Sequence, residues 1–346
     1  MKQLSSKRYV MQTSVIVSFV AFFFCTMLPV QAVHAETVEE GAKREGKVVF
    51  YCGMVFPDVR ALADGFQKKY PFVKLEHYRA GENKILEKLL TEKRGGKTFA
   101  DVEHMAGLWT NVYKKEGLLT KYVSPEAKIF PQGFSDPEGF WTAYYNTYLT
   151  FIYNTRLVTG KDIPKSLDDL LLPKWKGKKI GLYDDEFEWY VGMMDLLGKE
   201  KGPQFMKRLG DQDLVLRGGR TLISTLLVAG EFPLALGAVH RTLAEQKIGA
   251  PIALVNFPTP TLASMRCIGI HPNAPHPNAS KLLVDFILSK EGQTILNRIN
   301  RHPIRADIPV EPAVEAVRRN LFPIGPQSLE RLQGLKKEYE KVLLKR

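Results

Sequence analysis

The polar run Arg217-Gly218-Gly219-Arg220-Thr221 is the clearest candidate binding motif, because it joins a short apolar segment to a helical pattern. The N–H groups at the start of a helix have no partner within the helix and attract anions. With Arg217 and Arg220 beside them, these groups would suit a carboxylate or a phosphonate. The run therefore predicts an anion-binding site, and a plain glycine turn with solvated arginines is the alternative.

Further candidates come from the ends of predicted strands, where open α/β sheets bind their ligands. Arg79, close to Gly81, offers the same chemistry as the first run. His104 and His240 would bind a solute or a metal, and a structural role is the alternative for each. The full set of predicted ligand-binding residues is Tyr51, Cys52, Arg79, Gly81, His104, Asp185, Gly219, Arg220, Thr221 and His240.

Motifs of the common enzyme and metal-binding classes are missing from the sequence. It contains no HExxH, CxxC, GxxxxGK[ST], GxGxxG or GxSxG pattern. This weakens the metalloprotease, zinc-finger, nucleotide-hydrolase, dinucleotide-binding and serine-hydrolase interpretations. We therefore predict no catalytic residue, no metal site and no cofactor. The chain is not expected to be an enzyme, and a secreted enzyme on the same scaffold is the alternative.

Composition and charge narrow the class of partner. The chain has 346 residues, with 49 Lys and Arg against 37 Asp and Glu, and a formal net charge of +12. Hydrophobic residues make up 45% and charged residues 25%, which excludes a disordered chain. A positive surplus suits nucleic acid, a membrane surface or an anionic ligand. Because no basic run is longer than a few residues, nucleic acid is not an expected partner.

The first thirty-five residues have the layout of a secretory signal peptide. A basic start precedes the almost wholly apolar stretch 15–30, and Val33-His34-Ala35 would precede the cleavage site. The apolar stretch is shorter than the roughly 20 residues that a spanning helix needs. We predict that residues 1–35 are a cleaved export signal, with a retained anchor as the alternative. Cys52 and Cys267 would remain in the exported protein, as buried thiols or as a disulfide.

Strand and helix patterns alternate in the first part of the exported chain. Residues 48–51, 73–78 and 100–105 are β-prone. Residues 57–70 and 85–90 have apolar side chains at helical spacing. This βαβαβ order favours a mostly parallel sheet with helices on its faces.

A second α/β unit is predicted in the middle of the chain. Residues 179–183 and 232–236 have strand patterns, and residues 222–227 between them have a helical one. Residues 141–154 form a long, β-prone segment rich in tyrosine. We expect this segment and residues 255–260 to carry the chain from one unit to the other and back.

Four segments, in order over most of the exported chain, carry a family resemblance. They are YNTRL at 153–157, KSLDDLLLPKWKGK at 165–178, AGEFPLA at 229–235, and motifs between Ala274 and Arg305. Together they resemble the bacterial extracellular solute-binding proteins of ABC importers, of the ferric-ion-binding type. Each match alone is modest, and the set is specific to the family but not to a ligand.

The resemblance implies a two-lobed α/β receptor in which each lobe is a mostly parallel sheet flanked by helices. Such receptors close by a hinge motion on a ligand between the lobes, and deliver it to an inner-membrane ABC permease. On this interpretation residues 36–143 and 257–310 form lobe 1, and residues 144–256 form lobe 2. Residues 311–346 form a C-terminal helical segment that packs on the lobes. We expect the protein to be a monomer.

Iron is the best-known ligand of the resembled family. Its ferric binders usually carry adjacent tyrosines just after the AGExPIA strand, but here residues 236–240 contain no tyrosine. Phenolate oxygens suit ferric iron, so the departure weakens direct ferric coordination. The pair Tyr144-Tyr145 lies in the expected hinge. We therefore predict a small organic anion as the ligand, with ferric iron or an iron chelate as the alternative.

Overall fold

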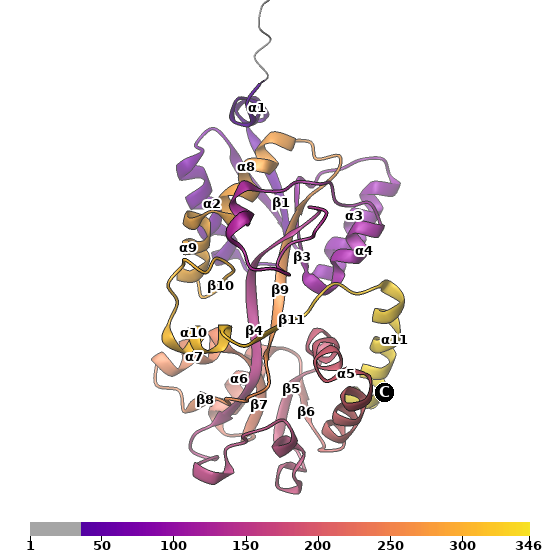
Figure 1. Ribbon diagram of the computed structural model, residues 1–346, viewed down its shortest axis with the longest axis vertical. Helices are drawn as coiled ribbons and strands as arrows, with labels where there is room; N and C mark the ends of the chain where they lie inside the picture. The colour runs from indigo at the N-terminus through magenta and orange to yellow at the C-terminus, as the bar shows by residue number, and fades with distance from the viewer. Residues whose placement is uncertain (1–35) are drawn as a thin grey trace, which may run out of the picture. The chain divides into compact units, whose positions relative to one another are not determined.

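The first part of the chain alternates strands and helices in the predicted order. The structure is a computed structural model that describes residues 36–346, so the predicted export signal lies outside the described residues. Strand β1 pairs in parallel with both β2 and β3, which confirms the βαβαβ prediction (Figure 1). The elements are α1 (Val38–Glu45), β1 (Lys47–Cys52), α2 (Phe56–Lys69), β2 (Lys74–Arg79), α3 (Glu82–Arg94), β3 (Val102–Ala106) and α4 (Thr110–Lys115).

Helix α2 illustrates why these segments fold as they do. Pro57 stands in the first turn, where a missing N–H costs nothing. Val59, Leu62 and Phe66 recur at helical spacing and are fully buried, so one face of the helix packs on the sheet. The helix ends at Lys69, just before Tyr70 and a proline that cannot continue it.

Two long strands, β4 (Thr142–Asn154) and β9 (Thr261–Ile270), run between the first α/β unit and the second (Figure 1). They pair with each other in an antiparallel ladder that contains a bulge between Ala143 and Tyr145. The first of these strands covers the β-prone segment predicted at residues 141–154. The second begins at Thr261, just after residues 255–260, which contain two prolines without ladder donors.

The second α/β unit follows β4. Strand β5 pairs in parallel with β6 and β7, and β7 pairs antiparallel with β4. The sheet is therefore parallel at its two ends and antiparallel in its centre, in the order β2-β1-β3-β9-β4-β7-β5-β6. The elements are β5 (Ile180–Tyr183), α5 (Phe187–Gly210), β6 (Val215–Arg217), α6 (Arg220–Ala229), β7 (Leu234–Ala238), α7 (Val239–Lys247) and β8 (Ile252–Leu254).

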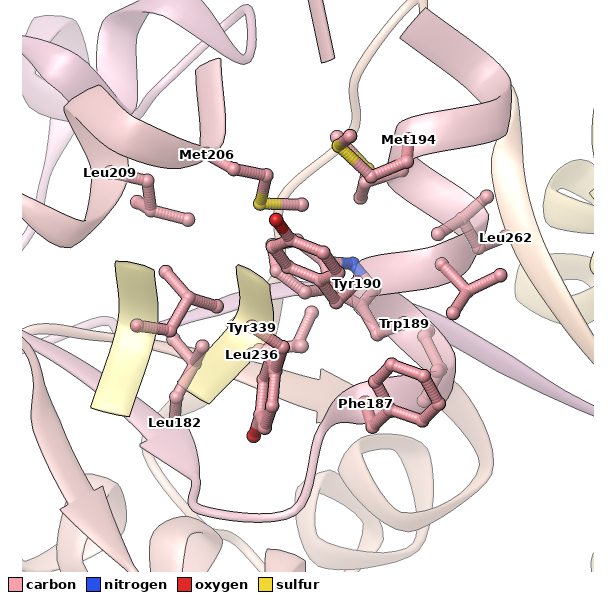
Figure 2. Close-up of a cluster of buried hydrophobic side chains, with 14 of the residues drawn as sticks. Leu182, Phe187, Trp189, Tyr190, Met194, Met206, Leu209, Leu236, Leu262 and Tyr339 are labelled. Atoms are coloured by element: carbon pink, nitrogen blue, oxygen red, sulfur yellow. The ribbon is translucent and has the colours of Figure 1, made fainter. Parts of the chain in front are cut away.

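Helix α5 is the largest element that the sequence patterns did not indicate. Its first turns bury Trp189, Tyr190 and Val191 in succession, so no single apolar stripe marks it as a helix. Gly198 has φ of 77°, which breaks the helix into two parts. Figure 2 shows its side chains packed with Leu182 of β5, Leu236 of β7 and Tyr339. The helix is thus held within the core of the second unit.

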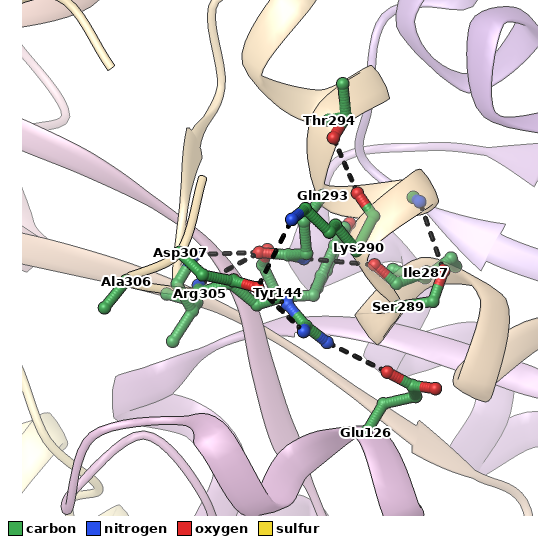
Figure 3. A network of polar contacts seen from close by, with 12 residues as sticks. Glu126, Tyr144, Ile287, Ser289, Lys290, Gln293, Thr294, Arg305, Ala306 and Asp307 are labelled. Carbon is green, nitrogen blue, oxygen red and sulfur yellow. Dashed lines mark hydrogen bonds and ion pairs between the residues drawn. The ribbon is translucent and has the colours of Figure 1, made fainter. Parts of the chain in front are cut away.

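The last part of the chain returns to the first unit before it reaches the second. Figure 3 shows Gln293 at this junction, where its amide nitrogen donates to the carbonyls of Tyr144 (2.8 Å) and Ile287 (3.0 Å). Its amide oxygen accepts from the N–H of Ile304 at 2.8 Å, so the tail is fixed to β4. The elements are α8 (Pro277–Leu288), α9 (Lys290–Arg298), β10 (His302–Pro303), α10 (Pro312–Arg318), β11 (Leu321–Pro323) and α11 (Leu329–Tyr339), with a final helical turn at Glu340–Leu344.

Both remaining cysteines lie in the interior as free thiols. Cys52 and Cys267 are fully buried and unpaired, and burial raises the pKa of both thiols. Within residues 36–346, none of the helices combines the length and the apolar character that crossing a membrane requires. The lobe boundaries expected from the family resemblance stay a prediction.

Candidate functional site

A cavity of about 1100 Å³ lies among helix starts of both α/β units, the central strand β9 and helix α11. Its size is slightly above the range of roughly 300–1000 Å³ for small-molecule sites. The lining mixes charged, aromatic and aliphatic side chains, as ligand sites do. The lining residues are Gly81, Glu82, Asn83, Lys84, Leu108, Trp109, Tyr183, Asp185, Phe187, Glu188, Arg220, Arg266, Leu329, Leu332, Gln333, Lys336 and Lys337.

Helices α3, α5 and α6 all begin at the cavity without a side-chain cap. Helix α3 starts after Gly81 and helix α6 after Gly219, and neither glycine can accept from the first-turn N–H groups. Gly219 has φ of 130°, a conformation that residues with a Cβ rarely adopt. The uncapped starts present partial positive charge to the cavity. Arg220 of the predicted glycine–arginine motif therefore lies at the cavity wall, while Arg217 is paired with Glu231 outside the lining.

Arg220 is oriented by a buried carboxylate. Its Nε and Nη2 donate to the two oxygens of Glu186 at 2.6 and 2.7 Å, and Glu186 is fully buried. Burial alone would lower the pKa of Arg220, but the charge of Glu186 outweighs it and raises that pKa. The guanidinium is thus permanently charged, and its third nitrogen is not used by Glu186.

Arg266 joins carboxylates from the two α/β units. Its guanidinium donates to Glu188 of α5 at 3.1–3.2 Å, and its Nε lies 3.5 Å from Glu82 of α3. Burial would raise the pKa of Glu82, but Arg266 and His104 lower it to about 2. The three side chains therefore form a charged bridge across the cavity floor.

His104 connects this bridge to the central strands. Its Nδ1 is 2.7 Å from the hydroxyl of Tyr144, and its Nε2 is 3.6 Å from Glu82. Burial lowers the pKa of His104, although Glu82 opposes the shift. Burial also raises the pKa of the phenols of Tyr144 and Tyr145. His104 is therefore a buried, neutral support for Glu82, behind the cavity lining.

A second charged cluster lies around Arg301. Its Nε and Nη2 donate to Asp58 at 2.9 and 2.5 Å, and its guanidinium lies 5.6 Å from the ring centre of Tyr145. His240 accepts from Arg301 at 3.4 Å, and its ring centre is 5.8 Å from that of His302. Burial and the charge of Arg301 lower the pKa of His240 to about 3. We call Arg301, Asp58, His240 and His302 the Arg301 cluster.

The structure brings together only part of the predicted site. Gly81, Asp185 and Arg220 line the cavity, and Gly219 precedes α6 at its wall. His104 and His240 belong to the two clusters beside it.

Four further predicted site residues are not among the lining residues either. Tyr51 is buried and its hydroxyl donates to Glu92 at 2.8 Å, and Cys52 is part of the apolar core. Arg79 is exposed and its Nε donates to the carbonyl of Met54 at 3.0 Å. The hydroxyl of exposed Thr221 accepts from Arg241 at 3.3 Å. Each of these side chains is already bonded or packed elsewhere in the protein.

The cavity is also lined by charged residues that are not among the predicted ligand-binding residues. Glu82 follows the predicted Gly81 directly, and Glu188 comes shortly after Asp185. Arg266 is the single charged residue of strand β9, which is a signal for a buried functional charge. Lys336 and Lys337 lie on the C-terminal helix, where an ordinary surface lysine has the same sequence pattern.

Metal ligands are not gathered in the part of the chain that the structure describes. Within it, no group of three or more His, Cys, Asp or Glu side chains is arranged to hold an ion. The adjacent phenols of Tyr144 and Tyr145 lie edge to face, with ring centres 4.8 Å apart.

Two α/β units joined by long antiparallel strands, with a charged cavity between their helix starts, define a two-lobed solute-binding protein. Residues 105–323 match the family described as bacterial extracellular solute-binding protein, and this chain belongs to that family. The family and the two-lobed α/β fold predicted from the sequence are therefore confirmed. Members of the family are binding proteins that serve ABC transporters, which confirms the general function.

Relatives of this chain are described with different ligands. A Salmonella typhimurium protein, named provisionally as a 2-aminoethylphosphonate-binding periplasmic protein, is 25% identical over 68% of this chain and 71% of its own. Iron-bound HitA from Pseudomonas aeruginosa has a TM-score of 0.71 at 22% identity, covering 85% of this chain and 99% of its own. The periplasmic binding protein AfuA from Actinobacillus pleuropneumoniae, with fructose-6-phosphate bound, has a TM-score of 0.68 at 24% identity, covering 86% and 99%.

Proposed function

We propose that this protein is a monomeric periplasmic receptor that binds a small anionic solute in the cavity and delivers it to an inner-membrane ABC permease. Residues 1–35 would direct its export and then be removed. The receptor would bind its solute without chemical change, so it would not be an enzyme. Family membership supports the transport role, and the cavity supports the class of solute.

The observation that carries the class of solute is the positive lining of the cavity. Five Lys or Arg side chains line it against three Asp or Glu. The uncapped starts of α3 and α6 add the partial charge of their N–H groups. A carboxylate, phosphonate or phosphate group would accept from these donors, and hydrogen bonds to charged groups contribute about 1.5–3 kcal/mol each.

Closure around the solute would use the bridge at the cavity floor. Glu82 and Glu188 come from helices of the two lobes and both face Arg266. When the lobes separate, Arg266 on β9 would keep at most one of these carboxylates, so the bridge forms in the closed arrangement. We therefore expect solute binding to be accompanied by compaction of the protein.

The ferric alternative is retained as an outcome of the test. A ferric chelate such as ferric citrate carries carboxylates and would be an anionic solute, whereas a bare ferric ion would need phenolate or carboxylate donors. An absorbance band from tyrosinate–iron coordination would distinguish the bare ion from the chelate. Iron in the relative HitA is a property of that protein.

Calorimetric titration of the exported chain tests the proposal. The panel is acetate, succinate, phosphonoacetate, glycerol 3-phosphate, 2-aminoethylphosphonate and ferric citrate. We expect heat with at least one of them, and a smaller radius of gyration in scattering once it is bound. A protein that gives neither heat nor compaction with any of them would contradict the proposal.

A test variant and a matched control show whether the solute binds in the cavity. Arg220→Ala combined with Glu186→Gln removes the guanidinium without leaving a buried carboxylate charge. We expect it to weaken binding by about 30-fold, equivalent to about 2 kcal/mol. The control Arg319→Ala removes an arginine whose side chain is 76% exposed, and should leave affinity unchanged. Equal losses in both variants would argue against the cavity as the site.

A further inference from the structure

The C-terminal helix α11 forms one wall of the cavity. Leu329, Leu332, Gln333 and Lys336 line it at the spacing of one helix face, together with Lys337. Leu332 belongs to the same buried cluster as Leu108, from the segment that follows β3. The helix therefore closes the cavity with polar groups on its last turns and apolar groups on its first.

The wall is fixed to the start of helix α5. The hydroxyl of Tyr339 accepts from the N–H of Glu186 and donates to the carbonyl of Asp184, both at 2.9 Å. Its ring lies 5.8 Å from Phe187 and 5.5 Å from Tyr190. A buried aromatic side chain with a satisfied hydroxyl holds its helix in one position. Helix α11 is therefore a rigid part of the second lobe (Figure 2).

Most cations of the cavity are already matched by carboxylates of the protein. Arg220 is held by Glu186 and Arg266 by two carboxylates. Lys336 lies 3.5 Å from Asp185 and between two aromatic rings, each with its centre 5.1 Å away. These three side chains have less charge to offer a solute than the count of basic residues suggests.

Two lysines of the lining are different. Lys84 on α3 and Lys337 on α11 are exposed, and neither takes part in any ion pair among residues 36–346. They come from two walls of the cavity that belong to different lobes. An unmatched ammonium beside a cavity adds its full charge to the local potential.

From this arrangement we infer that Lys84 and Lys337 are the specificity-determining residues of the site, and that they select solutes with two negative charges. The inference rests on the proposed function and deepens it. The arginines and helix starts orient an anionic group, while the two lysines supply the charge that the protein leaves unmatched. Because the lysines belong to different lobes, a dianion between them also favours the closed arrangement.

Titrations with three dianions, succinate, phosphonoacetate and glycerol 3-phosphate, test the inference. For the tightest of the three, we expect about a fivefold loss of affinity in Lys84→Ala or Lys337→Ala and about 30-fold in the double variant. Lys337→Arg should stay within twofold of the wild type. The loss should shrink in 0.5 M salt, because exposed charges are screened. A lost packing contact would not show this salt dependence.

Lys201→Ala is the matched control, since Lys201 is an exposed lysine of α5 outside the cavity lining. The inference is overturned if the double variant binds within twofold of the wild type, or if the control loses as much. It is also overturned if the wild type binds none of the three dianions. In that case binding of acetate, 2-aminoethylphosphonate or ferric citrate that depends on Arg220 would leave the proposed function standing.

Discussion

The bridge at the cavity floor and the Arg301 cluster each contain an arginine that neighbours Tyr145, yet they differ in what surrounds the charge. Arg266 lies between carboxylates of two lobes at the edge of a cavity that contains further cations. Arg301 is matched by one carboxylate, Asp58, and faces the neutral ring of His240. The difference indicates that the first region has charge available for a ligand. The second is a local structural contact.

The largest effect should come from leaving a buried charge without a partner at the cavity. Arg220→Ala removes both hydrogen bonds from Glu186, which is fully buried. Breaking such a pair costs about 3–5 kcal/mol of the free energy of unfolding. Urea denaturation measures it, and adding Glu186→Gln should restore most of the loss. If Arg220→Ala unfolds at the same urea concentration as the wild type, Glu186 is not the buried charge described above.

A smaller effect is expected at the Arg301 cluster. Arg301→Ala leaves Asp58, whose side chain is 12% exposed and keeps some contact with water. We expect a loss of about 2 kcal/mol, below the range for fully buried pairs. Solute affinity should stay within twofold of the wild type, since Arg301 does not line the cavity. A large loss of affinity with an unchanged stability would reverse the comparison and make the Arg301 cluster part of the binding site.

Acid should act on the histidines of the Arg301 cluster before it acts on the carboxylates of the bridge at the cavity floor, and His104 behind the bridge shares the histidine range. Burial and the neighbouring charges lower the pKa of His240 and His302 to about 3. Between the ordinary histidine pKa and that value the unfolded chain binds more protons, so stability falls as the pH falls. Glu82, with its pKa lowered to about 2, loses its contribution only below the ordinary glutamate range.

Unfolding measured at pH 7 and pH 5 tests this separation. We expect His240 and His302 each to lower the free energy of unfolding by about 2 kcal/mol between these pH values, because the unfolded ring takes up a proton that the buried ring excludes. His302→Gln should remove about 2 kcal/mol of the fall. Replacing the half-buried residue His77 of β2 by Gln is the control and should leave the slope unchanged. A slope that persists in full in His302→Gln would assign the acid sensitivity to other groups.

What the sequence predicts well is local in the chain. The βαβαβ order and helix α6 come from short periodic patterns, and Gly219 and Arg220 are adjacent to each other. Helix α5 was not predicted from the sequence, because its buried residues lie on all sides of the helix and leave no single apolar face. The bridge between Glu188 and Arg266 joins residues 78 positions apart, and no local pattern relates them. The same holds for Lys337, which reaches the cavity only because Tyr339 fixes its helix to α5.

The smallest effect is expected when the contact of Tyr339 with the start of α5 is weakened. This change tests whether solute binding depends on helix α11, the C-terminal wall of the cavity. Tyr339→Phe keeps the ring contacts with Phe187 and Tyr190 but leaves the N–H of Glu186 without its acceptor. An unsatisfied buried donor costs about 1 kcal/mol or slightly more, which urea denaturation would detect. Solute affinity should fall about threefold, because Lys337 would be held less firmly beside the cavity. The same change at the exposed residue Tyr78 is the control. If Tyr339→Phe loses stability but no affinity, the position of α11 does not matter to the solute, and the cavity would be defined by α3, α5, α6 and β9 alone.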